Sequence, residues 1–268
     1  MTPRLSLVLP AYESAGFVAS SVKEVLAFLD RHGIDGEVVV VDDGSRDGTA
    51  DAVPPAERVR VLRQRVNAGK GAALRVGMLA ARGRVRAFTD ADLPYGTEPL
   101  LSALGYIEAR RYHAVIGDRT LPGSTYAHAG AVRGLVSSLA SVGFRTLVTG
   151  GVYDTQCGFK AFRDDVAREL FGLATIDGFA IDVELIYLML KYRLDIKRLP
   201  VRLRRNASSS VRVVRDSIRA SRDVARMRRN WALGRYRSPA LERRLGDDLE
   251  TDRAEFLLRD PPGVTGDR

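Results

Sequence analysis

The chain has 268 residues, of which 45% are hydrophobic and 28% charged, and its formal net charge is +9. These values are typical of one large globular domain with a modest extension, and they exclude wholesale disorder. The single cysteine, Cys157, excludes an intramolecular disulfide framework. The sequence contains no run of 18 consecutive apolar residues and no signal-peptide pattern, so we expect a cytoplasmic protein without a membrane span.

Apolar runs alternate with helical patterns through the first half of the chain, which is typical of β-α-β units. This alternation predicts an α/β fold: a mostly parallel, Rossmann-like sheet with helices on both faces. In chain order, strands are predicted at residues 5–10, 37–41, 59–63, 85–89, 114–117, 158–162 and 195–203. Helices are predicted at residues 15–31, 48–53, 69–82, 97–110, 129–148, 164–172 and 181–192.

The positive charge is concentrated in residues 201–237, which hold twelve arginines against Asp216 and Asp223, a local balance of +10. Six of the arginines recur at steps of three and four residues, which places them in one stripe along a C-terminal basic helix. The stripe consists of Arg212, Arg215, Arg219, Arg222, Arg226 and Arg229. It favours an anionic surface, either phospholipid headgroups or nucleic acid, although a solvated charged face explains it equally well.

These patterns divide the chain into three parts. Residues 1–205 are predicted to form the main domain and residues 206–237 a basic amphipathic helical extension. Residues 238–268 carry mixed charge and Pro239, Pro261 and Pro262, so we expect a flexible tail there.

Acidic residues follow three of the predicted strands. Glu13 comes after the first, Asp42-Asp43 after the second and Asp90-Ala91-Asp92 after the fourth. Ligands bind at the carboxyl ends of the strands in open α/β sheets, so we expect these clusters to converge on one crevice. Because Mg²⁺ is held by few protein carboxylates together with substrate phosphate oxygens, Asp90 and Asp92 are candidate metal ligands. A single Asp-x-Asp would be more simply explained as a turn or helix cap.

The segment Asn67-Ala68-Gly69-Lys70-Gly71 is not a nucleoside-triphosphate-binding P-loop, because Gly71 stands where Ser or Thr must reach Mg²⁺. A helix that begins near Gly69 nevertheless offers free backbone N–H groups and the Lys70 side chain. We therefore expect an anion site there, with an ordinary helix start as the alternative.

Several motifs occur in a consistent order: Leu5–Tyr12, Val39–Thr49 and Asp90–Asp92, and among them Arg65–Gly71, Gly117–Arg119, Asp154–Lys160 and Phe179–Glu184. The first three resemble the signature of family 2 glycosyltransferases, which have a GT-A fold. The others are similar to the branch of dolichyl- or polyprenyl-phosphate glucosyltransferases and mannosyltransferases. The resemblance covers about residues 4–236.

The resemblance implies a role for each matching residue. Contacts to the nucleotide sugar are expected from Pro10, Tyr12, Glu13, Asp42, Asp43, Lys70, Asp90 and Gln156. Mg²⁺ or Mn²⁺ would be bound by Asp90 and Asp92, and the catalytic residues would be Asp92, Asp154 and Asp182. The lipid phosphate would be bound by Arg119, Arg133 and Arg212; Arg212 is the nearest basic residue where the branch commonly has a Ser-Lys pair.

The expected reaction is transfer of a hexose, with glucose favoured, from UDP-glucose or GDP-mannose to a polyprenyl or dolichyl phosphate, with inversion. We expect it at an anionic membrane surface, on the cytoplasmic face, by a peripheral protein. The acceptor oxygen is already charged, so alignment and charge neutralisation would suffice without a strong base. The alternative is a soluble family 2 glycosyltransferase that acts on a glycan or small molecule. A nucleic-acid-binding protein would leave the acidic strand ends unexplained, so no specific nucleic-acid partner is expected.

Overall fold

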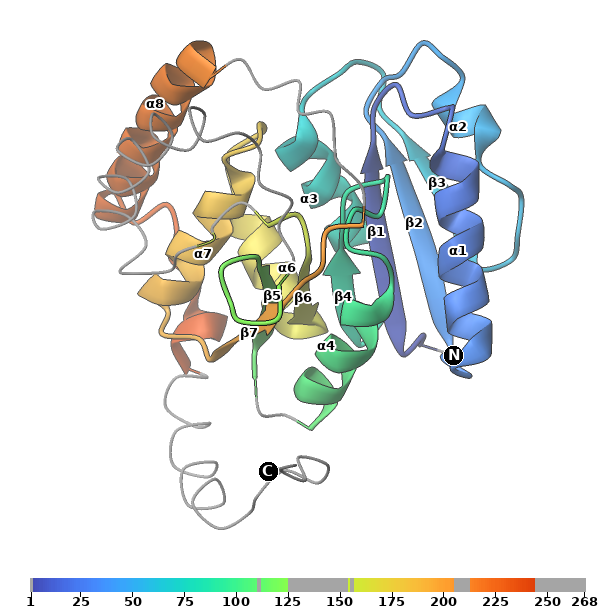
Figure 1. Cartoon of the computed structure of the whole chain (residues 1–268). Helices are drawn as coiled ribbons and strands as arrows, with labels where there is room; N and C mark the ends of the chain where they lie inside the picture. Colours follow the sequence, from blue (N-terminus) through green and yellow to red (C-terminus); the bar gives the residue numbers. More distant parts are fainter. Residues whose placement is uncertain (1, 110–111, 125–153, 155–156, 205–212, 244–268) are drawn as a thin grey trace.

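A computed structural model of the chain describes residues 2–109, 112–124, 154, 157–204 and 213–243, with the backbone alone for 213–221 (Figure 1). The predicted helix 129–148 lies outside the described residues. So do three predicted site residues: Arg133, Gln156 and Arg212.

A seven-stranded sheet forms the centre of the fold, in the order β3-β2-β1-β4-β6-β5-β7. β6 pairs antiparallel with both β4 and β5, whereas the remaining pairs are parallel. The predicted α/β fold with a mostly parallel sheet is confirmed, and the reversed direction of β6 is an addition to it. The strands are β1 (Leu5–Ala11), β2 (Gly36–Asp42), β3 (Val59–Arg63), β4 (Val85–Phe88), β5 (Ala114–Asp118), β6 (Lys160–Arg163) and β7 (Ile196–Pro200).

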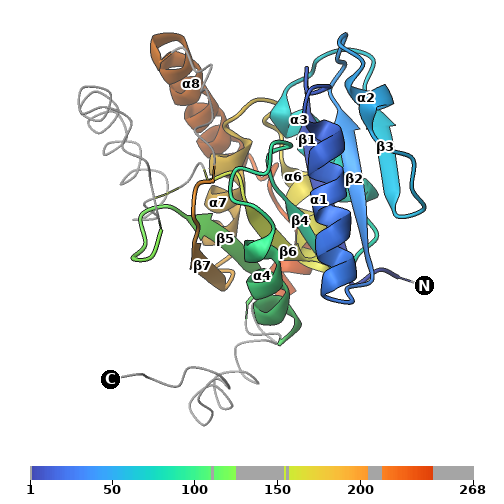
Figure 2. The same ribbon diagram turned by 45° about the vertical axis from the view of Figure 1, so that its right-hand side comes forward.

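Helices cover both faces of this sheet, as predicted. α1 and α4 pack on one face, and α3, α6 and α7 pack on the other (Figure 2). α8 lies outside α7, at the edge of the molecule (Figure 1). The helices are α1 (Val18–Arg31), α2 (Thr49–Ala52), α3 (Lys70–Ala80), α4 (Glu98–Glu108), α6 (Asp164–Leu173), α7 (Ile181–Lys191) and α8 (Val213–Ala232).

The central strands are apolar on both sides, which is why they appear in the sequence as uninterrupted hydrophobic runs. In β1, Leu7 and Leu9 belong to the core beneath α1 and α4, whereas Val8 belongs to the core beneath α3, α6 and α7. The alternation follows from the two-residue repeat of a strand. Two hydrophobic cores therefore hold the sheet from opposite faces.

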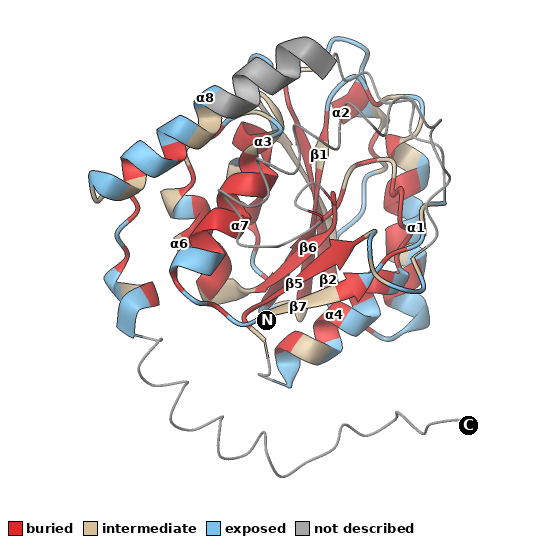
Figure 3. Cartoon of the chain, turned by 60° about the vertical axis from the view of Figure 1, so that its left-hand side comes forward, coloured by how far each residue is buried: buried red, intermediate tan, exposed pale blue. Residues whose placement is uncertain are grey.

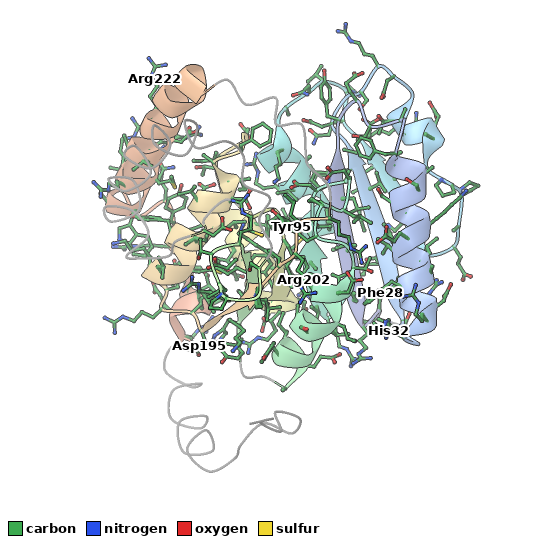
Figure 4. The ribbon with its side chains drawn as sticks, in the orientation of Figure 1. Phe28, His32, Tyr95, Asp195, Arg202 and Arg222 are labelled. Atoms are coloured by element: carbon green, nitrogen blue, oxygen red, sulfur yellow. The ribbon has the colours of Figure 1, made fainter. Side chains whose placement is uncertain are left out.

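The core beneath α3, α6 and α7 is called the second core. The C-terminal part of the chain packs on it through α8. Met227 is buried, and the ring of Trp231 meets that of Tyr187 on α7 edge to face at a centroid distance of 6.2 Å. The outer side of the described part of α8 is exposed (Figure 3), and Arg222 lies on that side (Figure 4). The described part of α8 is thus amphipathic.

The segment after α8 continues to pack on the domain. Ser238 and Leu241 are buried, and the Ser238 N–H donates to the Tyr192 hydroxyl at 2.8 Å. This corrects the predicted tail at its beginning: residues 238–243 are part of the packed structure, because they complete the core beside α7. Residues 244–268 lie outside the described part of the chain.

No helix in the described ranges combines the length and the apolar character needed to cross a membrane.

Three phenylalanines of the second core pack against one another and should contribute to the stability of the fold. The Phe171 ring meets the rings of Phe162 and Phe88 edge to face, at centroid distances of 5.8 and 6.2 Å. Phe171→Ala would leave a cavity, so we expect the free energy of unfolding to fall by about 3–5 kcal/mol. Urea unfolding measures this change. Leu101→Ala, at a position that is 45% exposed, is the control, with an expected change below about 0.5 kcal/mol; equal losses in the two variants would contradict the prediction.

Candidate active site

The three acidic strand ends lie at the same edge of the sheet, as the sequence predicted. β1 is paired in parallel with β2 on one side and with β4 on the other, and Ala11 at the end of β1 is level with Asp42. Backbone and side chain together connect the loops that follow β1 and β2. The Glu13 N–H donates to the Ser45 hydroxyl at 3.0 Å, and a Glu13 carboxylate oxygen accepts from the N–H of Arg46 at 2.9 Å.

The other residues of these two strand ends differ in exposure. Pro10 is half-buried and Tyr12 is 49% exposed, so the Tyr12 ring is accessible at the rim of the site. Asp42 is buried, and its carboxylate accepts a hydrogen bond from the N–H of Ser45 at 3.0 Å. Asp42 therefore shapes the turn that follows β2.

Asp43 holds the loop that leads into α3. Its two carboxylate oxygens accept from the N–H groups of Ala68 and Gly69, each at 2.8 Å. Gly44, with φ of +71°, lets this loop approach closely, because a Cβ at that position would lie 2.5 Å from the carbonyl carbon of Val66. Asp43 thus fixes the backbone directly before Lys70, the first residue of α3.

A chain of alternating charges runs from the strand end into the core. The Lys70 Nζ lies 2.7 Å from Asp90 Oδ1 and 3.3 Å from Asp182 Oδ2. The other oxygen of Asp182 pairs with the Nζ of Lys160, which also donates to the carbonyl of Cys157 at 2.9 Å. The Asp90 side chain is 39% exposed, whereas that of Lys160 is 1% exposed. This chain of charges is therefore accessible to solvent at its Asp90 end.

The neighbouring charges keep Asp182 and Lys70 ionised. Burial disfavours the carboxylate of Asp182, but Lys160 and Lys70 outweigh that effect and lower the pKa of Asp182. Burial likewise disfavours the ammonium of Lys70, and the charges of Asp182 and Asp90 outweigh it, so the pKa of Lys70 is raised. Lys70 is therefore a fixed positive charge beside Asp90 at neutral pH.

Arg119 and Asp154 form a second ion pair. The Arg119 Nε donates to Asp154 Oδ2 at 2.7 Å and Nη2 donates to Oδ1 at 2.8 Å, while the backbone N–H of Arg119 also donates to Oδ2 at 2.8 Å. Asp154 is buried, and the hydrogen bonds and charge of Arg119 outweigh that burial and lower its pKa. Asp154 thus fixes the plane of the guanidinium, an arrangement that suits recognition of a phosphate.

The buried residues Tyr95 and Cys157 lie beside the two ionic groups. Tyr95 lies near the middle of the molecule (Figure 4), and burial raises the pKa of its hydroxyl, with a further increase from Cys157. Burial raises the pKa of Cys157 to about 11, so this thiol stays protonated. Gly158 lies directly against Asp90, because a Cβ there would lie 2.1 Å from Asp90 Oδ2. The segment before β6 therefore forms one wall beside Asp90.

The start of α3 differs from the predicted anion site. The N–H groups of Gly71 and Ala72 donate to the carbonyl of Asp177, at 2.6 and 3.2 Å. The expectation of free N–H groups is wrong for these two residues, because a loop before α7 caps the helix. The positive charge of Lys70 remains as the group that faces Asp90.

Asp90 and Asp92 fit a divalent cation that shares its coordination with a substrate. Both are half-buried carboxylates at the carboxyl end of β4, and the described residues include no cluster of three or more His, Cys, Asp or Glu side chains able to hold a metal ion. Mg²⁺ commonly takes one or two carboxylates together with substrate phosphates. The donor set is therefore suitable for a cation that arrives with a diphosphate.

Sequence reasoning placed Asp90, Asp182 and Lys70 in one site, and the structure brings them together. It missed Lys160 and Glu184. Lys160 is a charged residue at the start of a strand whose neighbours Phe159 and Phe162 are buried, and such a pattern indicates a buried partner. Glu184 stands in the apolar helix α7, which is the same kind of signal.

A family model for glycosyl transferase family 2 matches residues 6–171. The chain belongs to this family. It is 33% identical over 265 residues to the dolichyl-phosphate beta-glucosyltransferase of Drosophila melanogaster, covering 90% of this chain and 79% of that protein. It is 30% identical over 257 residues to the Saccharomyces cerevisiae protein of the same name, covering 87% and 76%.

Solved structures agree on the fold of this family 2 member. The glucosyl-3-phosphoglycerate synthase of Mycobacterium tuberculosis matches with a TM-score of 0.62 at 21% identity, covering 87% of this chain and 80% of that chain. The same enzyme in complex with Mn²⁺, UDP and glucosyl-3-phosphoglycerate matches with a TM-score of 0.59 at 21% identity, with the same coverage. The predicted GT-A fold is confirmed.

The Arg119–Asp154 pair should make the free energy of unfolding depend on pH. The folded-state pKa of Asp154 is lowered, so its stabilising effect is complete above the ordinary value of 3.8 and is lost as pH falls through the lowered value. Asp154→Asn should therefore lower the free energy of unfolding by about 3 kcal/mol at pH 7 and by less below about pH 4. Urea unfolding between pH 3 and pH 7 measures both effects.

The control for this prediction is Asp51→Asn. Asp51 pairs with Arg63 at the surface, where both side chains are more than half exposed. Its loss should change the free energy of unfolding by less than about 1 kcal/mol. A difference between wild type and Asp154→Asn that is constant from pH 3 to pH 7 would contradict the assigned ionisation of Asp154.

Proposed function

We propose that this family 2 glycosyltransferase transfers glucose from UDP-glucose to a polyprenyl phosphate of the dolichyl type, with inversion at the anomeric carbon. The observation that carries the proposal is the junction of Asp90, Lys70 and Asp182 at the carboxyl edge of the sheet. It occurs in a chain about 30% identical, over most of its length, to dolichyl-phosphate beta-glucosyltransferases. UDP-glucose is the first donor to test, with GDP-mannose second, because a protein of this fold was solved with UDP-glucose and Mn²⁺.

The donor is proposed to lie along the strand ends. Pro10, Tyr12, Glu13 and Asp42 would contact the base and ribose. Lys70 would contribute positive charge near the diphosphate, because Asp182 and Asp90 hold its ammonium group at this edge. Asp43 would act through the backbone of the loop before α3. Positioning of charge before the reaction stabilises the transition state without further reorganisation.

A divalent cation would be held by Asp90 and Asp92. It would supply neutralisation of the negative charge that develops on the departing diphosphate. The described residues contribute the rest: Lys70 keeps a positive charge beside Asp90, and Lys160 keeps Asp182 ionised.

The acceptor phosphate is proposed to meet Arg119, whose guanidinium plane Asp154 fixes. A phosphate oxygen carries its own negative charge, so it can attack the anomeric carbon without a protein base. The new bond joins this oxygen to the sugar, and the bond to the nucleoside diphosphate breaks with its electrons on the diphosphate. Asp154 and Asp182 would orient the reacting groups, and Arg133, Gln156 and Arg212 remain proposed contacts outside the described residues.

The exposed side of α8 is proposed to bind an anionic membrane surface on the cytoplasmic side. Arg222, Arg226 and Arg229 are exposed there, whereas Met227 faces the core. Each arginine near an anionic bilayer contributes about 1 kcal/mol of attraction. A peripheral protein held in this way would meet a lipid phosphate at the surface where the lipid resides.

Product formation tests the reaction. Purified protein is incubated with UDP-glucose or GDP-mannose, with Mg²⁺ or Mn²⁺, and with a short polyprenyl phosphate. We expect a metal-dependent glucolipid from UDP-glucose, and we expect Asp92→Asn to lower its rate at least about 100-fold. The control Asp51→Asn removes an exposed carboxylate and should keep wild-type turnover. Transfer only to a water-soluble glycan or small molecule would overturn the lipid acceptor.

Flotation with liposomes tests the membrane surface. The triple variant Arg222→Gln, Arg226→Gln, Arg229→Gln should lose at least about tenfold in binding to vesicles that contain anionic phosphatidylserine. A control with the same change in net charge, Arg31→Gln, Arg82→Gln, Arg84→Gln, removes exposed arginines outside α8. Equal flotation of both variants would contradict a role for α8.

A further inference from the structure

Glu184 is a buried carboxylate that the proposed reaction does not use. It lies on α7, two residues after Asp182, and its exposed fraction is 0%. Its Oε1 accepts from the N–H and the hydroxyl of Thr175, each at 2.9 Å, and from the hydroxyl of Tyr236; its Oε2 accepts from the N–H of Ile176 at 2.9 Å. Hydrogen bonds to charged groups are about twice as strong as neutral ones, so Glu184 firmly holds the loop before α7.

The loop that Glu184 holds is the one that caps α3. The carbonyl of Asp177 accepts from the N–H groups of Gly71 and Ala72, at 2.6 and 3.2 Å. The two segments touch directly, because a Cβ on Gly71 would lie 2.2 Å from the carbonyl oxygen of Ile176. A displacement of this loop would therefore move the first turn of α3.

The first turn of α3 carries Lys70, the residue whose ammonium group pairs with Asp90 and Asp182. α7 consequently holds Lys70 twice. Asp182 binds the side chain, and Glu184, through the loop, holds the backbone on which that side chain stands. Two attachments to one helix restrict both the position and the direction of the lysine.

We propose that Glu184 is a positioning residue that sets Lys70 against Asp90, and that Tyr236 completes its hydrogen bonding. The expected effect on donor binding rests on the proposed function. The placement of Lys70 rests on the contacts of the structure alone. The hydroxyl of Tyr236 also accepts from the Nδ2 of Asn230 on α8, at 3.4 Å. The arginine-bearing helix is thereby joined to the first turn of α3 through the hydrogen bonds of Tyr236, Glu184 and the loop before α7.

The protonation of Tyr236 agrees with this arrangement. Burial and the hydrogen bond to Glu184 raise the pKa of the Tyr236 hydroxyl to about 12, so it remains a donor at neutral pH. Tyr192 offers a matched control, because its hydroxyl is also inside the fold and binds the same C-terminal segment. It donates to the carbonyl of Tyr236 and accepts from the N–H of Ser238 at 2.8 Å, and within the described part of the chain it makes no hydrogen bond to Glu184.

The experiment compares Glu184→Gln, Tyr236→Phe and the control Tyr192→Phe in the full-length protein. Hydrogen exchange of the Gly71 and Ala72 amides is measured first, because these N–H groups report the cap on α3. We expect exchange to become about tenfold faster in Glu184→Gln and severalfold faster in Tyr236→Phe, with less than about a twofold change in Tyr192→Phe. Tyr236→Phe keeps the test decisive if Glu184→Gln does not fold.

Binding of UDP-glucose, measured by calorimetry, is the second readout. We expect its Kd to rise about fivefold in Glu184→Gln, while the KM for polyprenyl phosphate stays within about twofold of wild type. Equal exchange rates in Tyr236→Phe and Tyr192→Phe would overturn the positioning role. Absence of glucolipid in every variant, wild type included, would instead overturn the proposed function, and the exchange result would still decide the role of Glu184.

Discussion

The site depends on one constraint: the charges of Lys70, Asp182 and Lys160 leave water together. A buried ion without a partner costs several kcal/mol, so each of these groups requires its neighbours. Asp182 satisfies both lysines, one on each oxygen, and Asp90 adds the remaining negative charge at the open end. α3, α7, the start of β6 and the end of β4 must all meet before any of these charges is compensated. The ion chain therefore specifies how distant parts of the sequence assemble.

Local patterns were sufficient to predict most elements. The strand Val59–Arg63 was predicted with its observed bounds, and the helix predicted at 181–192 occurs at Ile181–Lys191. Such elements follow from hydrophobic periodicity, which is a property of neighbouring residues. The direction of β6 (Lys160–Arg163) is different in kind. It inserts antiparallel between β4 and β5, and that pairing is decided by contacts between residues far apart in sequence.

The site was predicted in outline for a related reason. Acidic residues after parallel strands of one sheet had to lie at the same edge, so Asp90 could be placed at the edge that carries Asp42 from the sequence alone. Which partner each side chain takes could not be read in this way. Asp43 binds the backbone of a loop, Arg119 binds Asp154, and Glu184 binds the loop that caps α3. These pairings depend on which segments lie close together in the folded chain. Their spacing in the sequence does not show this.

The reversed strand has an evolutionary consequence. Because β6 runs against β4 and β5, its first residue, Lys160, lies level with Phe88 at the carboxyl end of β4 and with Ile116 near that of β5. The connection from Asp118 to Lys160 therefore leaves and re-enters the sheet at the same edge, beside Asp90. Its length and composition can change between relatives without altering any strand pairing. The fold thus allows this connection to vary while the sheet that carries Asp90 keeps its pairing.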